Sequence, residues 1–396
     1  MSGKAVIVAA VTVFFFIFSP FSYSKTDIET EKGLTLEQLR SLPYVSYGEE
    51  EAGESKIGTI KYNREKSWKG FNLDEESLID MEGNLVHSWP GKGRVKILED
   101  GNILATNWEN SAIGKYTWGN VKVWEREDIL MHHDIALTYD NTILVPTKEV
   151  IEYKGRKVEF DVIVELDQNG NTISEWSSWD NFDDLKRFHE PSVLDRGDSQ
   201  EVERNEARTK MWGGEYDYYH LNSIQVLPDN KLGIKDKRFK KGNWLIHLNN
   251  REVTLILDKV SKKVTWSLDV PGGAHMPRML ENGNILIFEN GRQRKYSKVV
   301  ELDPLTKEAV WSYQADPPES FYSHAWGSAQ RLPNGNTLIS EAASGRAFEI
   351  TKKGETVWEW FTSRKNKEGK RAITYRVIRY PTEKIEKIIK DKISKK

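Results

Sequence analysis

The chain of 396 residues contains no cysteine. That absence excludes disulfides, thiolate metal sites, cysteine nucleophiles and lipoprotein anchors. An excess of charge is also missing, because 58 Lys and Arg stand against 60 Asp and Glu. Without a basic excess there is no electrostatic case for binding nucleic acid. A chain of this length can bury a large enough core without disulfide bonds.

Long apolar runs are scarce, and the one that stands out is at the N-terminus, at residues 5–18. It follows Lys4 and precedes Ser22-Tyr23-Ser24, a small-x-small cleavage candidate. The run is shorter than the roughly 20 apolar residues of a membrane-spanning helix. We expect residues 1–24 to be a signal peptide, with an uncleaved anchor as the alternative. The folded domain is then periplasmic or secreted.

What the chain does have is an internal repeat of six hairpins, each with a polar start, a turn rich in Gly, Asn or Lys, and a tryptophan close to its end. Asn-Gly and related pairs favour tight turns, and flanking runs rich in Val, Ile and Thr favour strands. With a second hairpin in each repeat, six four-stranded sheets result, which predicts an all-β, six-bladed β-propeller. The tryptophans are Trp89, Trp124, Trp176, Trp266, Trp311 and Trp358.

These tryptophans define a propeller over residues 58–362, with three segments outside the repeat. Residues 25–57 form an N-terminal extension. Residues 180–213 are a charged insertion between blades three and four, expected to be partly helical and either a lid or a solvated loop. Residues 363–396 are a basic tail ending in an amphipathic helix, which packs on the propeller or touches an anionic membrane surface, packing being favoured. The expected blades are 58–90, 91–126, 127–179, 214–268, 269–313 and 318–362.

Four of the eight histidines occupy corresponding places, each shortly before a turn in its repeat. Innermost strands line the axis of a propeller, so these imidazoles should meet around one cavity. Burying four such groups together is costly without a shared ligand, metal or charge role. The other histidines lack this context, and His132 is expected to face away from its neighbour as adjacent strand residues do. The four are His133, His220, His275 and His324.

Three functions fit this arrangement. The four imidazoles could bind a divalent transition metal such as Fe, Zn or Cu. Alternatively, one imidazole is a nucleophile or general base and the others orient an anionic substrate. Arginines near the histidine blades favour an oxyanion, because a guanidinium matches a face of oxygens; they are Arg278, Arg292 and Arg294, with Arg331 and Arg346 in comparable places. The third interpretation is a non-catalytic propeller that binds through its tryptophans and loops.

Several longer stretches carry a family resemblance: HLNSIQVLPDN at 220–230, VTWSLD at 264–269, HMPRMLENGNILIFENG at 275–291 and GSAQRLPNGNTLISEAASGRAFEITKKGETVWEW at 327–360, with weaker copies at 69–89 and 132–145. They resemble the bacterial arylsulfotransferase (arylsulfate sulfotransferase) family of exported six-bladed propellers. The resemblance implies transfer of a sulfuryl group from a phenolic sulfate to a phenol, in two half-reactions through a sulfated histidine. It also implies that no nucleotide donor (PAPS) or other cofactor is used, and that the substrate is a small aromatic or anionic molecule.

The resemblance also implies roles for residues. His220 and Asn222 match the family's His-x-Asn-Ser, and His275 opens the next blade. Arg292 or Arg294 is the sulfate-binding arginine, and His324 is the nucleophile candidate. Catalytic roles thus go to His324, His220 and His275, and substrate-binding roles to Arg278, Arg292, Arg294, Asn222 and Tyr322, the last from the aromatic stretch before His324. The chain departs from the family at Pro277, where an asparagine is usual, in having no disulfide, and in having His133 as a fourth imidazole.

Overall fold

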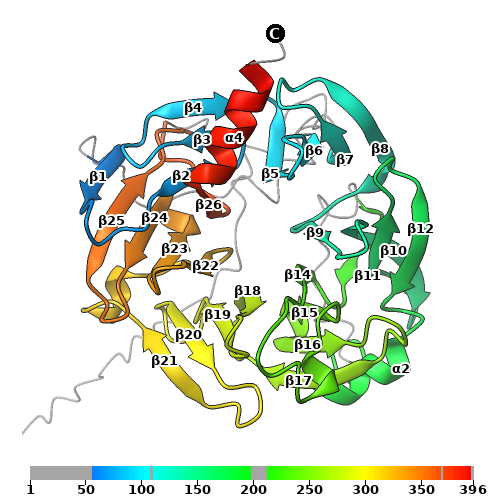
Figure 1. Cartoon of the computed structure of the whole chain (residues 1–396). Coiled ribbons are helices and arrows are strands. Elements are labelled where there is room, and N and C mark those ends of the chain that lie inside the picture. The colour runs from blue at the N-terminus through cyan, green and yellow to red at the C-terminus, as the bar shows by residue number, and fades with distance from the viewer. Residues whose placement is uncertain (1–55, 108–109, 198–211, 367–368, 394–396) are drawn as a thin grey trace, which may run out of the picture. The chain divides into compact units, whose positions relative to one another are not determined.

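The computed structural model describes residues 56–393, apart from 108–109, 198–211 and 367–368. By its internal contacts the chain divides into Met1–Thr35 and Leu36–Lys396, and only the second unit contains described residues. In that unit six antiparallel sheets surround one axis (Figure 1). The predicted six-bladed β-propeller is confirmed. The expected signal peptide at residues 1–24 and nearly all of the extension at 25–57 lie outside the described residues.

Each blade has four antiparallel strands, which follow one another from the axis outward. Blade one is β26 (Val377–Pro381), β2 (Gly70–Asp74), β3 (Ser77–Ile79) and β4 (Leu85–Ser88), and blade two is β5 (Lys92–Ile97), β6 (Ile103–Asn107), β7 (Ala112–Tyr116) and β8 (Lys122–Leu130). Blade three is β9 (Ala136–Leu137), β10 (Ile143–Tyr153), β11 (Arg156–Leu166) and β12 (Thr172–Ser177), with β13 (Tyr216–Asp217) parallel to β11. Blade four is β14 (Leu221–Val226), β15 (Trp244–Leu248), β16 (Val253–Leu257) and β17 (Val264–Asp269). Blade five is β18 (Ala274–Met279), β19 (Ile285–Glu289), β20 (Lys298–Leu302) and β21 (Ala309–Tyr313). Blade six is β22 (Ser328–Arg331), β23 (Thr337–Glu341), β24 (Arg346–Ile350) and β25 (Thr356–Phe361), with β1 (Gly58–Tyr62) added outside β25.

Both ends of the domain take part in closing the ring, and at these ends the boundaries differ from those expected. Residues 58–62, placed by sequence in blade one, pair with β25 of blade six. The tail expected to be only a helix, 363–396, supplies β26, the innermost strand of blade one. The propeller therefore extends past residue 362. A strand that completes a distant sheet has no turn or tryptophan signature of its own, so the repeat gave no sign of it.

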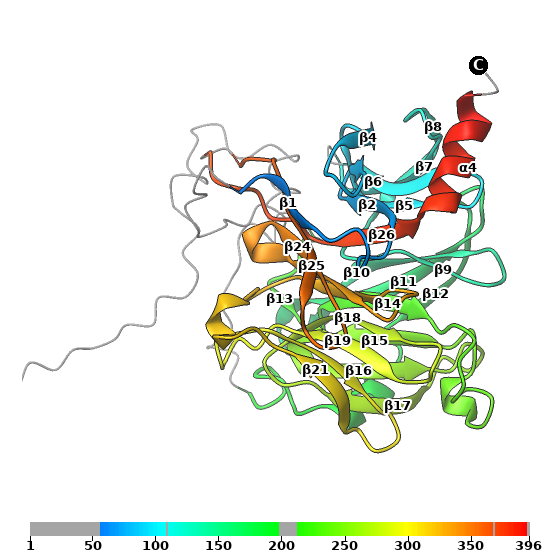
Figure 2. The same ribbon diagram turned by 60° about the vertical axis from the view of Figure 1, so that its left-hand side comes forward.

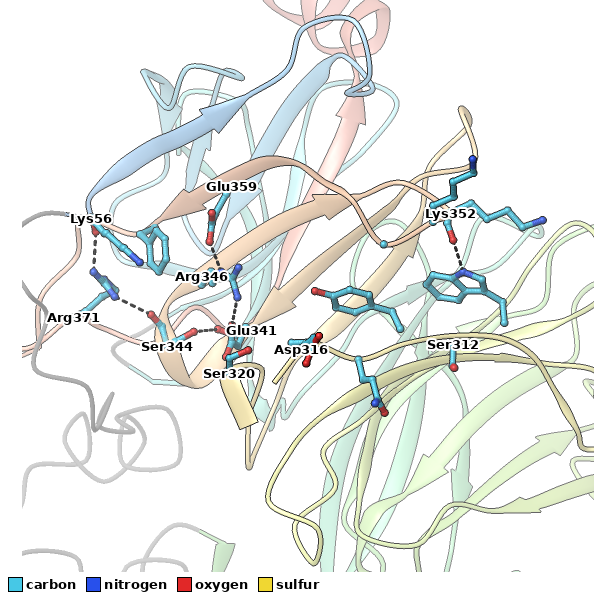
Figure 3. Close-up of a pocket in the computed structure, with 17 residues that line it drawn as sticks. Lys56, Ser312, Asp316, Ser320, Glu341, Ser344, Arg346, Lys352, Glu359 and Arg371 are labelled. Carbon is cyan, nitrogen blue, oxygen red and sulfur yellow. Dashed lines mark hydrogen bonds and ion pairs between the residues drawn. The ribbon is translucent and has the colours of Figure 1, made fainter. Parts of the chain in front are cut away.

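The repeat tryptophans join each blade to the next. All six lie in or directly after the fourth strand of their blades. In five of them the indole Nε1 donates to a backbone carbonyl in the turn between the third and fourth strands of the following blade. The bonds are Trp89 to Trp118 O (2.9 Å), Trp124 to Gln168 O (2.9 Å), Trp266 to Pro304 O (2.8 Å), Trp311 to Lys352 O (2.9 Å, dashed in Figure 3) and Trp358 to Met81 O (2.8 Å).

The sixth tryptophan is the exception. Trp176 is buried, yet its Nε1 has no hydrogen-bond partner among the described residues. It stands at the end of blade three, directly before the insertion at 180–213. The regular contact between blades is thus lost at one junction of the ring, and that junction is where the insertion begins.

Apolar side chains fill the spaces between neighbouring blades rather than the interior of single sheets. The cluster between blades one and two also receives helix α4 (Thr382–Ile393), whose Ile385 and Ile388 are buried there. Figure 2 shows α4 beside β2 and β26. The amphipathic helix therefore packs on the propeller, the outcome favoured by the sequence. Contact of the tail with a membrane stays a prediction.

The described part of the insertion is partly helical, as expected. It contains α2 (Phe182–Leu185) and the 3-10 turn η2 (Lys186–Phe188). Leu185 joins the cluster between blades three and four, and Phe182 and Phe188 pack against it. Short 3-10 turns also occur at η4 (Lys237–Phe239), η5 (Asn249–Arg251), η6 (Pro318–Ser320) and η7 (Ala342–Ser344). No helix within the described ranges has the length and apolar character needed to cross a membrane.

The tryptophan contacts predict a difference between two substitutions of equal size. Trp266→Phe removes an indole that is bonded to Pro304 O, whereas Trp176→Phe removes one whose Nε1 is unpaired; both residues are buried. A net hydrogen bond contributes about 1 kcal/mol. We expect urea unfolding to show that Trp266→Phe lowers the free energy of unfolding by about that much more than Trp176→Phe. Equal losses would show that the indole bonds do not stabilise the ring.

Candidate functional site

In each of blades two to six, a residue in the left-handed backbone region lies just before the innermost strand or within it. The φ angles lie between 49° and 61°. Such angles are uncommon for residues other than glycine, and backbone strain of this kind is concentrated at functional sites. Its repetition at one end of the inner strands marks that end of the axis as a constrained place. The residues are Arg94, His133, His220, Met276 and Trp326.

Two predicted histidines meet at this end. The rings of His133 and His220 lie 4.7 Å apart in an edge-to-face arrangement, although they come from different blades. His132 is there as well, because its Nδ1 is 2.9 Å from Nδ1 of His133. The expectation that His132 faces away was wrong. It assumed extended backbone, and the φ of +61° at His133 turns the two neighbouring rings toward each other.

Hydrogen bonds define the protonation of this pair. His132 Nε2 lies 3.1 Å from Thr147 O and 3.2 Å from Asp161 Oδ1, so it carries the proton toward two acceptors. Burial outweighs Asp161 and lowers the pKa of His132, which makes the ring neutral and its Nδ1 an acceptor. His133 must then donate from Nδ1. Burial, followed by His220, holds the pKa of His133 well below its ordinary value, so its Nε2 bears a lone pair.

His275 is fixed in the same tautomer by a different partner. Its Nδ1 is 2.7 Å from Asn290 Oδ1, and Asn290 Nδ2 donates to the carbonyls of Ser323 and Trp326, both at 2.8 Å. Those two bonds orient the amide, so His275 donates from Nδ1. Burial, reinforced by the charge of Arg292, lowers the pKa of His275 well below its usual value. A neutral His275 thus offers a lone pair at Nε2 and cannot donate there to a sulfate oxygen.

His220 differs from both because a carboxylate holds it. Its Nδ1 is 2.5 Å from Asp217 Oδ2, and its side chain remains 22% exposed, whereas His133 and His275 are buried. A histidine oriented by a carboxylate at one nitrogen and exposed to solvent is the arrangement of a general acid or base.

Arg292 connects this group to His324. Its Nε donates to the backbone O of His324 at 3.2 Å, and Nη2 donates to Asn249 Oδ1 at 3.0 Å. The charge of Arg292 depresses the pKa of His275 and His247, so it lies within electrostatic range of both. The ring of His324 lies 6.2 Å from that of Tyr322. Arg292, His275, His324 and Tyr322 are therefore brought together.

Two other predicted residues, Arg278 and Arg294, form ion pairs away from the histidines. Arg278 donates to Asp134 Oδ2 at 2.9 Å, and Arg376 donates to Asp134 Oδ1 at 2.9 Å, which ties blades five and one to the start of blade three across the axis. Although burial raises the pKa of Asp134, these two arginines outweigh it and hold the value well below normal. Arg294 lies in the turn after β19, where it pairs with Glu289 at 2.9 Å.

Asn222 has a mixed role. Its Nδ2 donates to Ala274 O at 2.8 Å and so joins β14 to β18. Its Oδ1 is buried and has no hydrogen-bond partner among the described residues. The Nδ2 group of this amide thus has a structural role. Its Oδ1 remains available, among the described residues, as a hydrogen-bond acceptor beside the inner strands.

A cavity of about 900 Å³ opens beside Arg292. One wall is residues 187–191 of the insertion, including Phe188, and another is the turn at 249–252. Tyr216 adds a further aromatic ring. The charged residues of the lining are of both signs: Arg187, Arg251, Arg292, Glu190, Glu252 and Asp269. A second cavity of about 930 Å³ lies near blades five and six (Figure 3). There Arg346 is held between Glu341 and Glu359, so that arginine is neutralised by carboxylates.

The metal hypothesis has no geometric support in the described parts of the chain. There, no three His, Asp or Glu side chains stand in an arrangement that could hold a metal ion. A site made of His133, His220, His275 and His324 stays a prediction.

Several residues of this region were missed from sequence. Asp217 is three positions before His220, a spacing that could have been noticed. Asn290 sits in the Phe-x-Asn-Gly-x-Arg stretch that also carries Arg292. Lys148 and Asp161, by contrast, lie on the long hairpin β10–β11 and reach the histidines only through tertiary packing, with no local signal.

Buried neutral imidazoles predict acid sensitivity. Burial, with smaller effects from Arg292 and His220, lowers the pKa of His247 to about 3. The unfolded chain takes up this proton near pH 6.5. Between about pH 6.5 and 3 the unfolded state binds a proton that the folded state does not, so stability falls as pH drops through that window. We expect the free energy of unfolding, measured with urea, to fall between pH 6 and 5 in the wild type. In His247→Asn this fall should be smaller by about 1.4 kcal/mol per pH unit. Identical slopes would contradict a neutral His247.

Several known proteins resemble this chain. Solved structures with a similar fold include a protein of unknown function from Bacteroides caccae (15% identity, TM-score 0.49, 79% of this chain and 99% of that one) and a streptogramin B lyase (11%, 0.44, 83% and 96%). Virginiamycin B lyase from Staphylococcus aureus is a third (10%, 0.41, 78% and 87%). No curated protein matches the chain. A model of the arylsulfotransferase (ASST) family matches residues 73–364, which is most of the propeller. The chain belongs to the arylsulfotransferase family.

Proposed function

We propose that this protein transfers a sulfuryl group from a phenolic sulfate to a phenol through a histidine at the propeller axis. The observation that carries the proposal is the place of Arg292. It lies beside His275 and His324 and also lines the 900 Å³ cavity. A guanidinium there supplies the cationic donors that sulfate oxygens require, next to imidazoles and next to space for an aryl group.

The chemistry proceeds in two half-reactions. A lone pair of the His324 imidazole attacks the sulfur, the bond from sulfur to the aryl oxygen breaks, and a phenolate leaves. In the second half-reaction the oxygen of an acceptor phenol attacks the same sulfur and the sulfur–nitrogen bond breaks. Arg292 binds the sulfuryl oxygens in both steps, where negative charge is spread over them. Because the donor ester carries the sulfuryl group itself, no nucleotide is needed.

The aryl groups are assigned to the 900 Å³ cavity. Phe188 and Tyr216 give it aromatic walls, and its charged lining is mixed, with arginines and carboxylates side by side. Flat aromatic rings bind well between such groups. The insertion then acts as a wall of the substrate site.

Export is proposed on the sequence alone, from Lys4 and the apolar run at 5–18. Sulfate esters and phenols would then be met in the periplasm or outside the cell. Peripheral membrane contact is likewise proposed on the sequence, through the N-terminal segment or through the lysine-rich tail helix.

The test is mass spectrometry of enzyme quenched after exposure to 4-nitrophenyl sulfate without an acceptor. We expect one sulfuryl group on the peptide that carries His324, removed on addition of phenol and absent in His324→Ala. An adduct on the His275 peptide would reassign the nucleophile. Absence of both adduct and transfer would overturn the proposal, and activity lost to a chelator and restored by Fe, Zn or Cu would favour the metalloenzyme.

The two arginines offered by sequence should separate in the same assay. Arg292→Ala removes a donor to the sulfuryl group, so kcat should fall roughly 100- to 1,000-fold. Arg294→Ala breaks an ion pair with Glu289 and a hydrogen bond to Tyr296 O within its own turn, and should leave kcat within a few-fold of the wild type. Equal effects of the two substitutions would remove the geometric argument for Arg292.

A further inference from the structure

A buried cluster of charged side chains lies directly behind His220. Lys148 Nζ is 2.5 Å from Asp217 Oδ1, 3.5 Å from Glu159 Oε2 and 3.8 Å from Asp161 Oδ1. All four side chains are at most 6% exposed. Strands β10 and β11 carry three of them, and β13, paired in parallel with β11, carries Asp217. Asp217 is further fixed by Asn250 Nδ2, which donates to its backbone O at 2.8 Å.

Carboxylates outnumber ammonium groups around Lys148. Three carboxylates lie within 3.8 Å of its Nζ. A carboxylate in contact with an imidazole favours the protonated form of that ring. His132, which contacts Asp161, does not carry the proton, because burial lowers its pKa. Among the described residues, the other imidazole in contact with these carboxylates is His220, bonded to Asp217.

Other charged groups face His220 from the surrounding elements. His133 lies against its ring, and His132, His247 and His275 are close enough for their charges to be coupled to that of His220. For His133, His247 and His275, burial keeps the ring neutral, so they add no positive charge that would oppose a proton on His220. Arg292, which acts on His247 and His275, and Arg94, which acts on His133, are opposing cations.

A two-step sulfuryl transfer needs a group that donates a proton in the first half-reaction and accepts one in the second. The first phenol leaves as a phenolate and must gain a proton, whereas the second phenol must lose one as it attacks. We propose that His220 is the acid and base of both half-reactions, and that Asp217, backed by Lys148, Glu159 and Asp161, is the positioning residue that holds its proton. The inference rests on the proposed function.

The proton balance is closed over one cycle. His220 begins as the imidazolium and gives its Nε2 proton to the departing phenolate as the sulfur–oxygen bond breaks. It is then neutral, with Nδ1–H still donated to Asp217. The acceptor phenol returns a proton to Nε2 as its oxygen forms the new bond to sulfur. Because Asp217 occupies Nδ1, proton exchange with the substrate must pass through Nε2.

Asp217→Asn tests the role without changing the size of the side chain. We expect kcat to fall roughly 100-fold or more while KM changes little, since general acid–base catalysis contributes about that much. The loss should be largest for phenyl sulfate, whose phenolate needs a proton most, and smaller for 4-nitrophenyl sulfate. Asp217→Glu should recover part of the rate. Asp195→Asn is the matched control, because Asp195 is a carboxylate bonded to Tyr153 and Ser192 rather than to a histidine.

A measurement independent of turnover separates this inference from the proposed function. In ¹⁵N-histidine NMR, His220 of the wild type should remain protonated at both nitrogens to a higher pH than in Asp217→Asn. An equal rate loss for every donor, or loss matched by Asp195→Asn, would overturn the inference and leave a structural role. So would an unchanged His220 titration. If the wild type transfers no sulfuryl group to any phenol, the proposed function fails and the acid–base role fails with it, whatever the NMR shows of the proton.

Discussion

Closure of the ring is the constraint on which the rest of this structure depends. Each blade is a sheet with apolar side chains on both faces, and it can bury them only between two neighbours, so the first and last blades must meet. Two strands from opposite ends of the domain achieve this, β1 on blade six and β26 inside blade one. The buried ion pair of Arg379 with Glu349 and the bond from Trp358 to Met81 O cross the same junction. Because an unpaired buried charge is costly, that ion pair favours one partner for the closing strand.

Closure also brings the starts of the inner strands to one axis, and two groups of interacting side chains form there, which we call the first and second layers. One is an ionic contact of Asp134 with Arg278 and Arg376, which joins alternate blades. The other is the histidine group, in which His133 and His275 are held neutral while His220 has a carboxylate partner. Both arginines of the first layer bond to the carboxylate of Asp134. Arg292 bonds to carbonyl and amide oxygens instead, and in the proposed function it is the cation that binds the anion.

The site lies where the repeat is broken. Trp176 is the repeat tryptophan whose indole has no hydrogen-bond partner within the described ranges, and the insertion that follows it walls the cavity at Arg292. The same junction, between blades three and four, places Asp217 of β13 against Lys148 of β10 and His220 at the start of blade four. Departures from a regular pattern are expected at functional sites, since a surface devoted entirely to stability leaves no room for a ligand. In this propeller the missing contact between blades and the added segment occur together, beside the groups that carry the proposed chemistry.

The sequence by itself determined the six blades and the tryptophan positions, because turn residues and strand periodicity are local properties. It singled out His133 and His220, which meet, but wrongly set His132 apart from them. It could not find β26 or the place of β1, since closing strands are recognised only by the distant sheet they complete. Tertiary structure also decided which arginine faces the histidines. Arg278 and Arg292 look alike in sequence, yet one meets Asp134 from another blade and the other meets His324 O. The tautomers of His133 and His275 and the charge behind His220 depend on Asn290, Asp161 and Lys148, which lie elsewhere in the chain. A side chain's direction and charge depend on φ and on partners across the axis, which are set only when the ring closes.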